Sequence, residues 1–68
     1  MKSILTKREK EIFDLLIKSN DTYEIARKLN ISDKTVRNHI SNVMQKIGVN
    51  TRYQAVIELI NTGELEIK

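Results

Sequence analysis

The sequence predicts an all-α fold of four short helices joined by tight turns. Four segments each begin with a residue suited to cap a helix and continue with apolar residues at helical spacing. The chain has no proline and only two glycines, so it lacks the regularly spaced turn residues of β-sandwiches and barrels. Its length of 68 residues suits one small domain, and we expect residues 1–68 to form one. The predicted helices span residues 7–18, 22–29, 33–47 and 52–61.

Composition excludes several classes of protein. There is no cysteine, so no disulfide and no thiolate zinc site can form, and the single histidine, His39, cannot build a metal cluster alone. No cofactor is expected. The longest apolar runs are three residues, far short of the roughly 20 that span a membrane or the ~7–15 of a signal peptide. We therefore expect a soluble, cytoplasmic protein with no membrane partner.

Side-chain caps define where the helices begin. In a capping box, the first side chain accepts from a backbone N–H three residues on, and that later side chain accepts in return. The predicted boxes pair Thr6 with Glu9, Asp21 with Glu24, and Thr51 with Gln54. Ser32 is the N-cap of 33–47, Asp33 suits the positive end of that helix, and Gly48 can end it in a left-handed conformation. Gly63 ends the fourth helix, and 64–68 is expected to be a short tail.

Apolar stripes predict the core. In the first three helices they comprise Ile12, Phe13, Leu16 and Ile17; Ile25, Ala26 and Leu29; and Val36, Ile40, Val43 and Ile47. The fourth helix has more apolar surface than one core face requires. Val56, Leu59 and Ile60 form one stripe there, with Tyr53, Ala55 and Ile57 partly outside it. Those extra residues either thicken a small core or form an interface with a second subunit.

Positive charge is concentrated in the middle of the chain. Residues 27–52 hold six cations and one carboxylate, and 34–57 hold no carboxylate, although the net charge of the whole chain is only +3. A long stretch without acids favours a polyanionic partner. The alternative is a chance distribution in a lysine-rich chain.

The third helix presents a polar face opposite its core stripe. That face and its flanks carry Lys34, Thr35, Arg37, Asn38, His39, Ser41, Asn42, Gln45 and Lys46. Amides, hydroxyls and a guanidinium are the groups that hydrogen-bond base edges in the major groove. A merely solvated face is the alternative, but such a face is expected to contain glutamates. The pattern favours contact with DNA.

Four segments together resemble the LuxR-type helix-turn-helix domain. They are LTKREKEIFDLL (5–16), YEIARKLNIS (23–32), KTVRNHISNVMQKIGVNTR (34–52) and QAV (54–56), and they match in register over nearly the whole chain. Asn30-Ile31-Ser32 supplies a turn of the length that a helix-turn-helix requires. The likeness is greatest to a member of the family in which this domain stands alone and regulates late sporulation genes.

The resemblance implies a role for each residue at the matching positions. Base readers would be Arg37, Asn38 and Ser41. Contacts with the DNA backbone would come from Thr22, Tyr23, Lys34, Thr35, His39, Asn42, Lys46 and Arg52. The dimer interface would comprise Tyr53, Val56, Ile57 and Ile60. His39 has an alternative role as a hydrogen-bonding residue at the core edge, and Arg52 as an internal anchor. The chain departs from the family at Ser19, often glycine, and at Ser41, lysine in some relatives.

We therefore expect a homodimeric, sequence-specific bacterial transcription regulator that binds pseudo-palindromic duplex DNA. If it activates transcription, RNA polymerase would be a further partner. Alternatives are the DNA-binding output domain of a longer response regulator, a sigma-factor region 4 domain, and a helical protein–protein adaptor. No enzyme is expected, because no serine has a base and an orienting group at the required spacing and no glycine-rich phosphate loop is present. No small-molecule ligand is expected.

Overall fold

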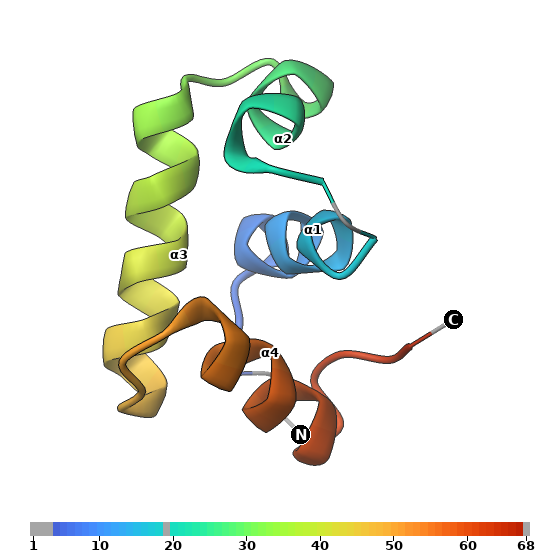
Figure 1. The fold of residues 1–68 in the computed structure, drawn as a ribbon, viewed down its shortest axis with the longest axis vertical. Coiled ribbons are helices and arrows are strands. Elements are labelled where there is room, and N and C mark those ends of the chain that lie inside the picture. The colour runs from blue at the N-terminus through green and yellow to red at the C-terminus, as the bar shows by residue number, and fades with distance from the viewer. Residues whose placement is uncertain (1–3, 19, 68) are drawn as a thin grey trace.

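The computed structural model describes residues 4–18 and 20–67, which form four helices and no strand. The helices are α1 (Lys7–Leu16), α2 (Thr22–Leu29), α3 (Asp33–Ile47) and α4 (Arg52–Asn61). The longest, α3, stands along one side of the molecule and packs against the other three (Figure 1). No helix in these ranges is long and apolar enough to cross a membrane. The predicted all-α fold is confirmed, while Ser19 lies outside the described residues.

The predicted caps of the first three helices are present. Thr6 Oγ1 accepts from the N–H of Glu9 at 3.1 Å, and Glu9 Oε1 accepts from the N–H of Thr6 at 2.9 Å. Asp21 and Glu24 form the same reciprocal pair at 2.8 and 2.9 Å. The hydroxyl of Ser32 caps α3. These starts are therefore encoded locally, within four consecutive residues each.

The start of α4 differs from the prediction in one bond. Thr51 Oγ1 accepts from the N–H of Gln54 at 3.1 Å, as a capping box requires. The amide of Gln54, however, accepts from the N–H of Asn50 at 3.2 Å rather than from that of Thr51. The cap is thus extended by one residue into the preceding loop.

The end of α1 also differs from the prediction, because α1 ends at Leu16 rather than at Lys18. The carbonyl of Leu15 accepts from the N–H of Lys18 at 3.1 Å, a tighter turn than the α-helix. It also accepts from the side-chain amide of Asn20 at 2.8 Å. These bonds satisfy the terminal carbonyl and stop the helix.

The turn from α2 to α3 depends on one left-handed residue. Asn30 has a φ of 57° and is the single non-glycine with positive φ among the described residues. Asparagine tolerates this conformation better than most residues. The next N–H, from Ile31, then donates to the carbonyl of Ala26 at 3.0 Å, which closes the end of α2. This turn sets the angle at which α3 leaves α2.

The predicted stripes of the first three helices supply most of the core. Its fully enclosed members include Ile12, Phe13, Ile25, Val36, Ile40 and Val43. In α4 the prediction was partly wrong, because Ala55 is fully buried beside Leu59 while Val56 and Ile60 are only half-buried. The C-terminal tail also contributes to the core, which was not predicted, since Leu65 is only 1% exposed. Its N–H donates to the carbonyl of Leu59 at 3.1 Å, which folds the chain back onto the core.

Glu9 is the one buried charged residue in the described part of the chain. Besides capping α1, its Oε1 accepts from Lys46 Nζ at 2.7 Å, and the same ammonium donates to the carbonyl of Ile4 at 3.0 Å. Burial alone raises the pKa of Glu9. Hydrogen bonds from Lys46 and Thr6, with the positive charge of Lys46, outweigh burial and hold that pKa below its usual 4.5. This contact fastens the last turn of α3 to the start of α1.

We predict that Glu9→Gln lowers the free energy of unfolding at neutral pH by about 1–2 kcal/mol, because glutamine keeps the cap but loses the charge-assisted bond. Since the folded pKa of Glu9 is depressed, its stabilisation is present at neutral pH and is lost as the pH falls through that pKa, below 4.5. Urea unfolding between about pH 3 and 7 measures both effects.

The matched control is Glu11→Gln, which removes a half-exposed carboxylate from the same helix. The two unfolding curves of the wild type and Glu9→Gln should converge at acid pH, whereas Glu11→Gln should follow the wild type throughout. A constant gap between wild type and Glu9→Gln at every pH contradicts the role of the buried charge.

Candidate nucleic-acid interface

The uncovered side of α3 carries the three predicted base readers. Val36, Ile40 and Val43 face the core, so the opposite surface of the helix is turned outward. Arg37, Asn38 and Ser41 are all exposed on that surface, and their spacing places them on neighbouring turns. Because α1, α2 and α4 lie on the other side of α3, nothing in the described fold screens this face (Figure 1).

The other predicted contacts on α3 differ in exposure. Lys34 and Asn42 are exposed, whereas Thr35 and His39 are half-buried. The Thr35 and Ser32 hydroxyls hydrogen-bond at 2.8 Å, at the first turn of the helix. His39 lies between the polar face and the core, a position compatible with both of its predicted roles.

Arg37 has an ionic partner on its own helix. Its Nη1 lies 3.0 Å from Oδ2 of Asp33, one turn earlier, while 57% of the arginine side chain remains exposed. From the sequence, Asp33 was expected only to stabilise the positive, N-terminal end of the helix. The i,i+4 spacing of an aspartate and an arginine was the signal that could have found this pair.

Lys46 is placed differently from the other predicted phosphate contacts. Its side chain is 34% exposed, and its ammonium is held by Glu9 and by the carbonyl of Ile4. Its contact with phosphate stays a prediction, but the structure gives this lysine a structural partner that sequence spacing alone could not reveal.

The start of α2 contributes an aromatic ring and a cation. Thr22 is half-buried, and Tyr23 is 61% exposed. The guanidinium of Arg27 lies over the Tyr23 ring, 5.7 Å from its centre. Arg27 was not predicted as a site residue, although a tyrosine and an arginine at i,i+4 spacing are placed to make this cation–π contact.

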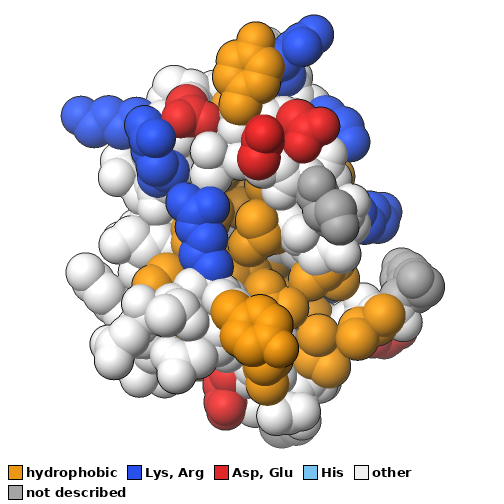
Figure 2. All heavy atoms as spheres, in the orientation of Figure 1, with side chains coloured by type: hydrophobic (Ala, Val, Ile, Leu, Met, Phe, Trp, Pro, Cys, Tyr) orange, Lys and Arg blue, Asp and Glu red, His pale blue; other side chains and the backbone are white. Residues whose placement is uncertain are grey.

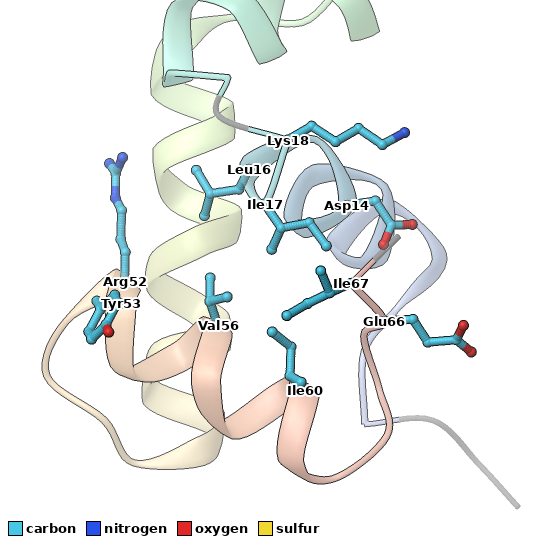
Figure 3. Close-up of a pocket in the computed structure, with 10 residues that line it drawn as sticks. All are labelled: Asp14, Leu16, Ile17, Lys18, Arg52, Tyr53, Val56, Ile60, Glu66 and Ile67. Atoms are coloured by element: carbon cyan, nitrogen blue, oxygen red, sulfur yellow. The ribbon is translucent and has the colours of Figure 1, made fainter.

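An apolar groove lies between α1, α4 and the C-terminal tail. Figure 2 shows hydrophobic side chains gathered over α4, and Figure 3 shows them turned toward one another. The groove has a volume of about 590 Å³ and is lined by Asp14, Leu16, Ile17, Lys18, Arg52, Tyr53, Val56, Ile60, Glu66 and Ile67. Three of the predicted interface residues, Tyr53, Val56 and Ile60, line this groove. The fourth, Ile57, lies nearby on α4 and is 41% exposed. The side chain of Arg52 points away from the groove centre (Figure 3).

Comparison with known proteins identifies the family to which the chain belongs. The family of bacterial regulatory proteins of the luxR type matches residues 3–59. The chain belongs to the LuxR family. It is therefore a DNA-binding transcription regulator, and its α2 and α3 are the two helices of the helix-turn-helix.

Among its relatives is the spore germination protein GerE of Bacillus subtilis, 62% identical over 66 residues, a match that covers 97% of this chain and 89% of GerE. A solved structure of the transcription factor GerE superposes with a TM-score of 0.95 at 54% identity, covering 98% of this chain and all of that one. The predicted likeness to a LuxR member whose domain stands alone is thereby confirmed.

Longer regulators match over only part of their length. The transcriptional regulatory protein DegU of Brevibacillus brevis is 45% identical over 65 residues, which are 96% of this chain but 28% of DegU. DesR of Bacillus subtilis is 44% identical over 52 residues, or 76% of this chain and 26% of DesR. The LuxR-family domain therefore occurs within larger proteins as well.

We predict that Ser32→Ala lowers the free energy of unfolding by about 1 kcal/mol, because it removes the side-chain cap from the start of α3. Ser41→Ala is the matched control, since Ser41 is exposed within the same helix, where alanine is favoured. Chemical denaturation of both variants tests the difference. Equal losses would show that the Ser32 cap does not stabilise α3.

Proposed function

We propose that this protein binds pseudo-palindromic duplex DNA as a homodimer and places α3 of each subunit in the major groove. The observation that carries the proposal is the outward face of α3, which is polar, cationic and uncovered by the rest of the described fold. A helix of this width fits the major groove of B-DNA, where each base pair presents a distinct pattern of donors and acceptors.

The chemistry of the three central residues suits base recognition. The Arg37 guanidinium can pair with the O6 and N7 of guanine, and the amide of Asn38 can pair with adenine. The Ser41 hydroxyl is short and reaches a base edge either directly or through water. Specificity is therefore expected to depend most on Arg37 and Asn38.

Contacts with phosphate would position the helix. Lys34 and Asn42 are exposed on α3, and Thr22 and Tyr23 open α2, where backbone N–H groups and the helix dipole favour an anion. Arg52 is exposed at the start of α4. Such contacts release counterions, so binding should weaken steeply as salt is raised.

The groove beside α4 supports association of two subunits. Val56 and Ile60 are half-buried there, and Tyr53 and Ile67 are each 76% exposed, so burying them against a second copy would add stability to a small core. A two-fold axis there would present two α3 helices about 34–36 Å apart, one turn of B-DNA.

The similarity to GerE also suggests a place in the cell. The name of the spore germination protein GerE associates it with spores, and we extend to this chain a role in the control of sporulation genes. Action in the cytoplasm at the nucleoid follows from a DNA target. If the protein activates transcription, RNA polymerase would be its second partner.

Selection from a pool of random duplexes at near-physiological salt, followed by sequencing, tests the proposal. The expected result is enrichment of two inverted half-sites about one helical turn apart. Enrichment of one half-site alone would contradict the dimer. Absence of any enriched sequence would contradict specific recognition.

We predict that Arg37→Ala weakens binding to the selected duplex by about 1–3 kcal/mol and removes the base preference at one position of each half-site. Lys34→Ala should instead weaken binding to all sequences alike and reduce the dependence on salt. Binding titrations with single-base-pair variants distinguish the two. A uniform loss in both mutants would contradict base reading by Arg37.

We also predict that Ile57→Glu weakens self-association at least about tenfold, because it places a charge in an apolar interface. Ile4→Glu is the matched control: Ile4 is 42% exposed, close to the 41% of Ile57, but it does not lie on α4. Sedimentation equilibrium measures the change. If both variants dimerise like the wild type, α4 is not the interface.

A further inference from the structure

Asp33 is the single carboxylate between residues 25 and 57, and it is the first residue of α3. A negative charge on a helix that faces phosphates opposes binding to DNA. The dipole of α3 stabilises that charge at the helix start, but this effect does not depend on which way the carboxylate points. Its contacts indicate a more specific role.

One oxygen of the Asp33 carboxylate is buried without a hydrogen bond in the described part of the chain, and the other is paired with a cation. Its Oδ1 is buried and accepts no hydrogen bond from the described residues. Its Oδ2 lies 3.0 Å from Arg37 Nη1, and this is the one ion pair that the described residues offer it. The side chain of Asp33 is 37% exposed, so the ion pair is accessible from the outer face of α3.

The pair leaves most of the guanidinium available. Only Nη1 of Arg37 is engaged, while Nη2 and Nε have no ionic partner in the described part of the chain. The planar guanidinium carries five N–H groups, so it can keep one carboxylate contact and still present an edge with two donors. The ion pair with Asp33 therefore leaves a second edge of the Arg37 guanidinium free to donate.

We propose that Asp33 is a positioning residue that sets base specificity: it holds the guanidinium of Arg37 in the orientation that reads guanine. This inference rests on the proposed function, in which Arg37 contacts a base edge. An arginine that is already held loses less conformational freedom when it pairs with the correct base. The carboxylate also repels phosphates, which weakens binding to every sequence alike and leaves the Arg37–guanine pair to supply the preference.

The test compares Asp33→Asn, Arg37→Ala and the double variant with the wild type. Asparagine is nearly isosteric with aspartate but carries no charge. Glu11→Gln is the control for a general change of one charge, because Glu11 is a half-exposed carboxylate paired with Arg8 on α1. Each protein is titrated against the selected duplex, against duplexes changed at single base pairs, and against a scrambled duplex at one salt concentration. Thermal unfolding confirms that each variant is folded.

Discrimination is the ratio of the dissociation constants for the changed and the selected duplex. At the base pair read by Arg37, we expect Asp33→Asn to lower this ratio about threefold or more. A bidentate arginine–guanine pair supplies roughly 5- to 150-fold in total. Discrimination at other base pairs should stay unchanged. In the Arg37→Ala background the same substitution should have no further effect on discrimination, and Glu11→Gln should leave the discrimination of the wild type unchanged.

Three results would overturn the inference. Discrimination could be unchanged in Asp33→Asn although Arg37→Ala abolishes it, in which case only the role of Asp33 fails. Asp33→Asn could lower discrimination equally with and without Arg37, which would mean that it acts through another group. Finally, a wild type that discriminates at no base pair would overturn the proposed function and this inference together.

Discussion

The orientation of α3 depends on the contact between Glu9 and Lys46. The two residues lie 37 positions apart in sequence, yet their side chains meet at 2.7 Å where the last turn of α3 crosses the start of α1. Glu9 also caps α1, so one buried carboxylate both starts the first helix and fixes the far end of the third. Removing Lys46 would leave the buried carboxylate of Glu9 without its charged partner, which is costly in a core this small. The turn at Asn30 fixes the other end of α3.

Held at both ends, α3 can act as a rigid platform for its outward side chains. A rigid helix matters because recognition of a base edge requires donors and acceptors to be placed accurately before binding. The fold achieves this with few residues: a continuous core stripe on α3 packs against all three other helices, and the opposite stripe is left for a partner.

The sequence was sufficient to predict what depends on neighbouring residues. Helix starts, the limits of α3 and the outward position of Arg37 and Asn38 all follow from caps and periodicity. Contacts between distant segments could not be predicted in this way. Burial of Leu65 depends on the tail folding back to the carbonyl of Leu59, and the face of α4 that is buried depends on how this helix crosses α3. Lys46 shows the same limit, because its spacing alone placed it on the polar surface of α3.

The most direct test of the central claim, that α3 enters the major groove, is methylation interference on a selected duplex. Dimethyl sulfate methylates guanine at N7 in the major groove and adenine at N3 in the minor groove, and the modified sites that prevent binding are then identified. We expect interference from guanine N7 in each half-site, with one guanine losing its effect in Arg37→Ala. Interference from adenine N3 alone would place the protein in the minor groove and would show that α3 does not enter the major groove.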